Sequence, residues 1–255
     1  MDSAVVDSDT SLDPSEIGGR HSDRPDDLDI GAAVALHRPE LIPPPPVGLP
    51  YERPHGLAAR AAKRTIDLVG ALLLLILLLP AWLVIALAIK LDSPGPILFR
   101  QRRIGQNGEA FWMFKFRTME DGADEQKAEL IHLNEAADGL FKIDGDPRIT
   151  GVGAWLRATC VDELPQLINV VAGKMSLVGP RPLVPNEDAL IVGADRCRHA
   201  MRPGMTGVWQ VGGASAIPIR KMVLLDRDYL EGWSLWLDLK LLLKTAQVVI
   251  LRKGV

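Results

Sequence analysis

The chain has 255 residues, a mass of 27.8 kDa and a formal net charge of −3, so it can hold one domain with a sizeable core plus appendages. Its first 50 residues carry ten acidic and three basic side chains, about −7, which leaves about +4 for the remainder. That small surplus fits an anionic ligand or an acidic lipid surface, and we expect no nucleic-acid partner. The two cysteines, Cys160 and Cys197, lack zinc-ligand or redox spacing, which favours a reducing compartment.

Residues 1–55 are predicted to form a disordered, acidic and proline-rich tail. The segment is rich in Asp, Ser, Gly and Pro, contains four consecutive prolines at 43–46, and has only 32–36 as an apolar stretch. It cannot bury enough apolar surface to offset the entropy lost on ordering. Because it lacks the basic start and short apolar core of a secretory signal, we interpret it as a tether.

An uncharged run of about 22 residues, Leu68–Ile89, is long enough to cross a bilayer core as one helix. Pro80 lies near its middle and predicts a kink. Basic residues flank both ends, whereas a spanning helix usually shows a charge bias; they are Arg60, Lys63 and Arg64 before the run and Lys90, Arg100, Arg102 and Arg103 after it. These features leave three alternatives: a helix that enters the membrane, breaks at Pro80 and leaves on the same side, a spanning helix, or a buried core helix.

A β-hairpin is predicted next, with short strands at 97–99 and Phe111–Phe116 around the turn Gln106–Gly108. Five basic residues crowd this hairpin, and they are Arg100, Arg102, Arg103, Lys115 and Arg117. Such crowding indicates a nearby anion, unless it is a solvated basic edge strand. A polar helix is expected over 120–135. In the turn that follows, Asp146 and Arg148 either bind a metal or phosphate or pair with each other.

We place the chemistry in the stretch Cys160–Pro182. Asp162 and Glu163 precede Pro165, and proline is tolerated only in the first turn of a helix, so the pair is predicted at the N-terminus of a helix that ends near Val171. Amide groups and the helix dipole there keep an aspartate ionised and attract a phosphate or a metal-bridged diphosphate. An isolated Asp-Glu pair in this position is otherwise an ordinary dipole-compensating surface pair.

More cations are spaced around this pair. Arg157 lies five residues upstream, and the rigid turn 179–182 carries Arg181, whose guanidinium can return toward the same phosphate. A helix is predicted over Asn186–His199, followed by the tight loop of Arg202. The apolar run Leu235–Ile250 has the composition of an interfacial helix, or of a helix that packs on the core.

Several of these segments resemble the bacterial sugar transferase family, the monotopic polyprenyl-phosphate sugar-1-phosphate transferases. CVDELPQLINVVAGKMSLVGPRP is similar to the family's SLDELPQL and GDMSLVGPRP, and SPGPILFRQRRIGQNGEAFWMFKFRTM is similar to its hairpin region. Lys63, Arg64 and Asp67 match its KRxxD start, and the segments 201–207, 226–229 and 233–240 resemble further motifs. The resemblance covers roughly residues 60–254.

The resemblance implies an α+β, mainly helical fold. It implies a re-entrant membrane helix over 60–90, broken at Pro80, after the tail 1–55. It also implies a small catalytic domain over 91–255 with a short β-hairpin and interfacial amphipathic helices. The catalytic domain would lie on the cytoplasmic face of the bacterial inner membrane, and self-association into a homo-oligomer is left open.

The same resemblance implies transfer of a sugar-1-phosphate from a nucleoside diphosphate sugar to polyprenyl (undecaprenyl) phosphate, at the start of exopolysaccharide or glycoconjugate synthesis. Asp162 would form a covalent aspartyl phosphosugar, and Glu163 would hold Mg²⁺. The expected partners are the two substrates and membrane lipids. The expected phosphate-binding residues are Lys115, Arg117, Arg148, Arg157, Arg181 and Arg202.

The chain departs from the family pattern at two positions. Ala214 stands where the family usually has an arginine, for which Arg220 is a candidate substitute, and Leu79 precedes Pro80 where a serine is common. The missing arginine and the acidic tail motivate an alternative, a catalytically degenerate membrane-anchored binding or scaffold protein. A metal-dependent lipid diphosphate hydrolase is a second alternative.

Overall fold

The computed structural model describes residues 55–123, 145–212 and 217–250, together with residues 126, 130 and 143. All of these belong to one compact unit, Leu41–Val255. The tail before residue 55, most of the polar helix expected over 120–135, and Ala214 lie outside the described residues.

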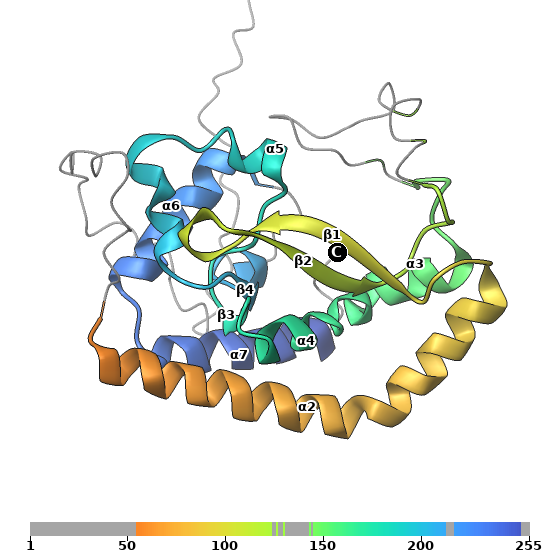
Figure 1. The fold of residues 1–255 in the computed structure, drawn as a ribbon, viewed down its shortest axis with the longest axis horizontal. Helices are drawn as coiled ribbons and strands as arrows, with labels where there is room; N and C mark the ends of the chain where they lie inside the picture. The colour runs from red at the N-terminus through yellow and green to blue at the C-terminus, as the bar shows by residue number, and fades with distance from the viewer. Residues whose placement is uncertain are drawn as a thin grey trace, which may run out of the picture. The chain divides into compact units, whose positions relative to one another are not determined.

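Helices and short 3₁₀ turns make up most of the described chain, as the predicted mainly helical α+β class requires (Figure 1). Two small two-stranded sheets accompany them, β1 with β2 and β3 with β4. In chain order the elements are α2 (Leu57–Asp92), β1 (Leu98–Ile104), η1 (Gln106–Gly108), β2 (Ala110–Phe116), α3 (Gly151–Ala158), η4 (Val161–Glu163), α4 (Gln166–Val171), β3 (Ser176–Val178), α5 (Pro185–Asp188), η5 (Gly193–Ala200), β4 (Gly204–Thr206), η6 (Gln210–Gly212), α6 (Ile219–Glu231) and α7 (Leu235–Ile250).

The apolar run forms one helix, α2, of 36 residues with Pro80 inside it. Figure 1 shows that the helix bends in its second half. Proline removes one backbone hydrogen bond and its ring crowds the preceding turn, which accounts for a bend. By length and composition, α2 is the one helix among the described residues that could cross a membrane.

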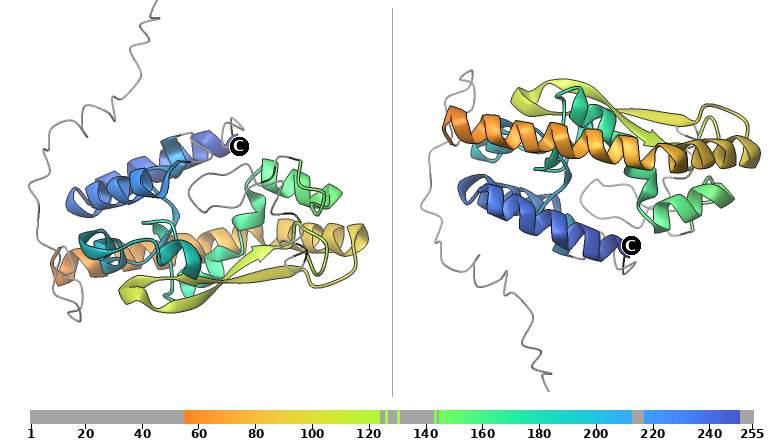
Figure 2. Two further views of the ribbon diagram at one scale, coloured as in Figure 1. Left: turned by 90° about the horizontal axis from the view of Figure 1, so that it is seen from above. Right: turned by 90° about the horizontal axis from the view of Figure 1, so that it is seen from below.

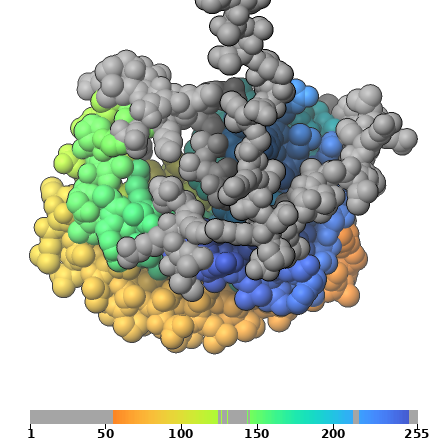
Figure 3. Space-filling view, turned by 180° about the vertical axis from the view of Figure 1, so that it is seen from behind, coloured from red at the N-terminus to blue at the C-terminus, as the bar shows by residue number. Residues whose placement is uncertain are grey.

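One stripe of α2 faces the rest of the unit. Its buried residues, Lys63, Asp67, Ala71, Ile85 and Ile89, recur at helical spacing and therefore share a face. The first half of the helix contacts β3, while Ile85 and Ile89 pack with Phe116 and Leu156. The outer surface is apolar and uncovered by the described residues, and α2 is visible along its length in Figure 3. Both halves of α2, before and after Pro80, thus rest on the same unit.

Charged side chains at the start of α2 bind α7 and β3, which are distant in the sequence. Lys63 Nζ lies 2.6 Å from an oxygen of Asp238 in α7, and Asp67 accepts hydrogen bonds from the Ser176 hydroxyl and the Leu177 amide of β3. Figure 2 shows α2 and α7 side by side, as this ion pair requires. In α7, Leu241 is buried in the core, so one of the two alternatives for this helix, packing on the core, is present, while Trp236 and Leu243 are exposed and an interfacial role stays a prediction.

The predicted hairpin is confirmed. β1 and β2 are antiparallel, with Arg103 opposite Phe111, and Asn107 and Gly108 adopt the left-handed conformation that such a turn favours. β1 is longer than predicted, because the basic residues at 100, 102 and 103 interrupt the apolar pattern that indicates a strand. The single helix expected over Asn186–His199 is wrong: α5 ends at Asp188, and η5 begins only at Gly193, which has φ 62°.

Candidate active site

Asp162 and Glu163 lie in η4, a 3₁₀ turn between α3 and α4. Cys160 precedes them with φ 55°, a left-handed conformation that is uncommon for a residue other than glycine and that turns the chain sharply after α3. Helix α4 begins after Pro165 and ends at Val171, as predicted. The carboxylate pair therefore precedes α4 instead of occupying its first turn.

Lys115 of β2 is the cation nearest to both carboxylates. Its Nζ lies 2.6 Å from Oε1 of Glu163 and 3.7 Å from Oδ2 of Asp162. The side chain of Asp162 is 12% exposed, that of Lys115 19% and that of Glu163 27%, so the cluster is half-buried and still open to a ligand. One ammonium group thus partly neutralises two carboxylates that would otherwise repel each other.

The side chain of Asn169 joins β2 to α4. Its Oδ1 accepts from the amide of Phe114 at 3.0 Å, and its Nδ2 donates to the carbonyl of Trp112 at 2.7 Å. These two bonds satisfy one backbone donor and one backbone acceptor on the edge of β2 that faces α4. They also fix the register between the strand that carries Lys115 and the segment that carries the carboxylates.

Arg157, in the last turn of α3, lies close enough to Asp162 for the two charges to interact. Its Nε donates to the hydroxyl of Thr118 at 2.8 Å. Burial lowers the pKa of Arg157, and the charges of Asp162 and Asp146 act against that shift. The predicted approach of Arg157 to the start of this segment is therefore present in the structure.

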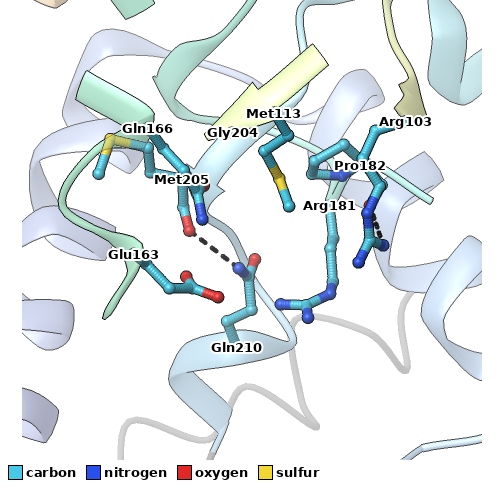
Figure 4. Close-up of a pocket in the computed structure, with 9 residues that line it drawn as sticks. All are labelled: Arg103, Met113, Glu163, Gln166, Arg181, Pro182, Gly204, Met205 and Gln210. Atoms are coloured by element: carbon cyan, nitrogen blue, oxygen red, sulfur yellow. Dashed lines mark hydrogen bonds between the residues drawn. The ribbon is translucent and has the colours of Figure 1, made fainter. Parts of the chain in front are cut away.

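A second group of cations lies beside Glu163, around the cavity drawn in Figure 4. The side chains of Glu163 and Arg181 lie on opposite sides of Gln210 in this view, with Arg103 next to Arg181. The guanidinium of Arg181 stacks over the indole of Trp209 at 5.3 Å. The cavity is lined by Arg103, Met113, Glu163, Gln166, Arg181, Pro182, Gly204, Met205 and Gln210.

Arg103 is one of the crowded basic residues of the hairpin and was not predicted to belong to the site. Burial and the neighbouring charge of Arg181 lower the pKa of Arg103 to about 10, against the opposing charges of Glu187 and Glu163. Strand alternation would have found it, because Arg103 and Lys115 lie on the same face of the hairpin. Two guanidinium groups that repel each other in this way favour an anion between them.

The two carboxylates differ in their ionisation. Burial alone would raise the pKa of Glu163, but the charges of Lys115 and Arg181 outweigh burial and lower this pKa to about 2. For Asp162, burial raises the pKa above its usual value, Lys115 and Arg157 oppose the rise, and the charge of Glu163 adds to it. Glu163 is thus a fixed anion, whereas Asp162 depends on its cations to stay ionised.

Three predicted phosphate-binding residues lie outside this cluster. Arg117 is buried at the end of α2, where it donates to the carbonyls of Ser93 and Pro94. Arg148 forms a two-armed pair with Asp146, with distances of 2.9 and 2.6 Å, which is one of the two alternatives left open for this turn. Arg202 donates to the carbonyl of Gly173 and lines a cavity near the start of α2. A phosphate role for these three stays a prediction.

Within the described ranges, no group of three or more His, Cys, Asp or Glu side chains is arranged to hold a metal ion. The donors at this site are the oxygens of Asp162 and Glu163. Mg²⁺ commonly binds one or two protein carboxylates and completes its shell with water and substrate phosphates. The two adjacent carboxylates are therefore ligands of the type that Mg²⁺ accepts.

The chain is similar to known proteins over most of its length. Residues 58–252 match the family model described as bacterial sugar transferase. The chain is 41% identical over 242 residues to a UDP-glucose:undecaprenyl-phosphate glucose-1-phosphate transferase of Caulobacter vibrioides, which covers 91% of this chain and 81% of the relative. It is 40% identical over 197 residues to the exopolysaccharide production protein ExoY of Rhizobium meliloti, which covers 76% of this chain and 87% of the relative. The chain belongs to the bacterial sugar transferase family.

Some relatives are considerably longer. A UDP-galactose-lipid carrier transferase of Erwinia amylovora is 42% identical over 201 residues, and the match covers 77% of this chain but 42% of the relative. The chain thus spans less than half the length of that protein.

Replacing Lys115 by methionine should move the acid limb of the pH–rate profile to higher pH, because Asp162 would lose the nearest charge that lowers its pKa. Turnover at neutral pH should fall about 100-fold. Initial rates measured across the pH range check both effects. Arg102→Met removes a cation from the exposed face of the same hairpin and should leave the profile unchanged. An acid limb that stays in place in Lys115→Met would show that another group controls Asp162.

Proposed function

We propose that the chain transfers a sugar-1-phosphate from a nucleoside diphosphate sugar to a polyprenyl phosphate through a covalent phosphosugar on Asp162. The observation that carries the proposal is the Asp162–Glu163 pair, in which Lys115 contacts both carboxylates and the charges of Arg157 and Arg181 act on Asp162 and Glu163 respectively. The Caulobacter relative, whose name gives undecaprenyl-phosphate as the acceptor, supports the same substrate class.

In the first step, a carboxylate oxygen of Asp162 attacks the sugar-proximal phosphorus of the donor. The bond from that phosphorus to the bridging oxygen breaks, and a nucleoside monophosphate leaves with the electron pair. Lys115 and Arg157 keep Asp162 ionised, while Arg181 and Arg103 offer positive charge on the Glu163 side for the departing phosphate.

In the second step, an oxygen of the polyprenyl phosphate attacks the same phosphorus. The bond to Asp162 breaks, the carboxylate is regenerated, and the product is a polyprenyl diphosphosugar. Both steps bring two anions together, so the cations around the pair lower the barrier by charge neutralisation. A Mg²⁺ ion held by Glu163 would add further neutralisation at the transferring phosphate when bound.

The position of α2 supports a re-entrant helix as the membrane anchor. Ile85 and Ile89, after Pro80, pack against the hairpin and α3, and Arg117 binds the carbonyls at the end of the helix. A spanning helix would carry this second half, together with the buried Arg117, across the membrane and away from cytoplasmic elements that the first half contacts. We therefore place both ends of α2 and the catalytic residues on the cytoplasmic face, at headgroup level where the acceptor phosphate lies.

The covalent step predicts that Asp162→Asn abolishes turnover and the phosphosugar adduct, because an amide is not a nucleophile toward phosphorus at neutral pH. Release of nucleoside monophosphate and the mass of the intact protein after brief exposure to donor measure the two losses. Asp228→Asn, on an exposed part of α6, is the matched control and should behave as wild type. Normal turnover in Asp162→Asn would refute the mechanism, and a wild-type chain that releases no nucleotide would favour the binding or scaffold alternative.

The metal role predicts that Glu163→Gln lowers the rate and raises the Mg²⁺ concentration needed for half-maximal activity, because one anionic ligand is lost. A magnesium titration at saturating donor measures this change. Glu109→Gln removes an exposed carboxylate from the hairpin and should leave the titration unchanged. If the titration of Glu163→Gln overlays that of wild type, Glu163 is not a metal ligand.

The re-entrant anchor predicts that both ends of α2 are reached from the cytoplasmic side. Single cysteines at Leu57 and Leu91, both exposed, are introduced into a Cys160→Ala/Cys197→Ala background. A membrane-impermeant thiol reagent should label both positions in inside-out vesicles and neither in intact spheroplasts. Labelling of the two positions from opposite sides would establish a spanning helix instead.

A further inference from the structure

The turn that carries Arg181 is held from behind by a buried ion pair. Arg198 of η5 donates to Oδ2 of Asp226 in α6 from Nε at 3.0 Å and from Nη2 at 2.8 Å. The side chains of Arg198 and Asp226 are 2% and 3% exposed. The same Nη2 also donates to the backbone carbonyl of Arg181 at 2.6 Å. One guanidinium group therefore joins α6 to the backbone of a residue whose own side chain faces the candidate active site.

The neighbouring carbonyls of this turn are held as well. Arg103 donates to the carbonyl of Pro182 at 3.0 Å, and the amide of Ile104 donates to the carbonyl of Leu183 at 2.8 Å. Pro180 and Pro182 restrict φ on either side of Arg181. Three consecutive carbonyls of this turn thus each have a donor, and the donor to the Arg181 carbonyl is Arg198.

The surroundings of Arg198 explain how a buried charge is tolerated there. Asp188 lies 4.0 Å away on the side opposite Asp226, and the ring of His199 contacts the same Asp188 at 2.8 Å. Burial raises the pKa of Asp226 to about 6, and the charge and hydrogen bonds of Arg198 oppose this rise. A buried ion pair is weak evidence for stability, because apolar residues of similar volume often stabilise a fold equally well. The extra bond to the Arg181 carbonyl gives the pair a second role.

We propose that Arg198, oriented by Asp226, is a positioning residue that sets the direction of the Arg181 guanidinium toward the phosphate side of the site. The inference rests on the proposed transfer reaction. Arg198 does not touch substrate in this account; it acts through Arg181. Its removal should therefore matter only while Arg181 is present.

A double-mutant cycle tests this dependence. Arg198→Met/Asp226→Leu replaces the ion pair by apolar side chains and removes the donor to the Arg181 carbonyl, without leaving an unpaired buried charge. In the wild-type background it should lower kcat and kcat/KM for nucleoside monophosphate release about 10- to 100-fold. In an Arg181→Met background the same replacement should change the rate less than about twofold. Thermal unfolding of each variant confirms that it is folded.

Equal losses in both backgrounds would overturn the inference, and so would a folded variant with wild-type kinetics. If the apolar pair does not fold, Arg198→Lys is used in the same cycle, because lysine keeps the charge opposite Asp226 but lacks the planar fork that serves two acceptors. Arg227→Met, which removes a partly exposed arginine from α6, is the matched control and should be neutral in both backgrounds. The proposed transfer itself fails separately, if the wild-type chain releases no nucleotide.

Discussion

Two adjacent carboxylates in a half-buried turn repel each other and lose hydration, so they persist only where positive charge is brought to them. In this chain the nearest charge comes from Lys115, which arrives from a strand of the hairpin about fifty residues earlier in the sequence. Several elements of the fold bring these charges together. The hairpin supplies the lysine, Asn169 fixes the strand against α4, and α3 ends so that Arg157 reaches the same pair.

The local elements could be predicted because their signals lie within a few residues. Asn107 and Gly108 indicate the hairpin turn, and the helix-breaking residues after Val171 indicate the end of α4. The contacts between segments that are distant in the sequence could not be predicted. β3 and β4 are only three residues long each, and their parallel pairing depends on packing beneath α2 that no local pattern encodes. The division of the predicted helix over residues 189–192 was also missed, because the charged residues of this segment suit either structure.

For the candidate site, too, some residues could be predicted from the sequence and others could not. Resemblance of the motifs to the family pointed to Asp162, Glu163, Lys115, Arg157 and Arg181; in the structure Lys115 contacts both carboxylates, and the charges of Arg157 and Arg181 act on them. The resemblance also included Arg117, whose guanidinium binds carbonyls at the end of α2, because the unpaired carbonyls of a helix terminus accept from cationic side chains just as a phosphate can. Basic residues in the sequence thus indicate that an acceptor for a cation lies nearby, but they do not show whether it is a phosphate or a set of backbone carbonyls. Arg103 shows the converse, since its role follows from the hairpin face on which it lies.

The amide of Asn169 has a consequence for how copies of this chain can meet. By bonding the Phe114 amide and the Trp112 carbonyl, it takes the place that a neighbouring strand would occupy along β2. A free strand edge invites another chain to extend the sheet, and here that stretch is already filled by a side chain of the same molecule. Sheet extension along this part of β2 is therefore blocked, and any self-assembly has to use another surface.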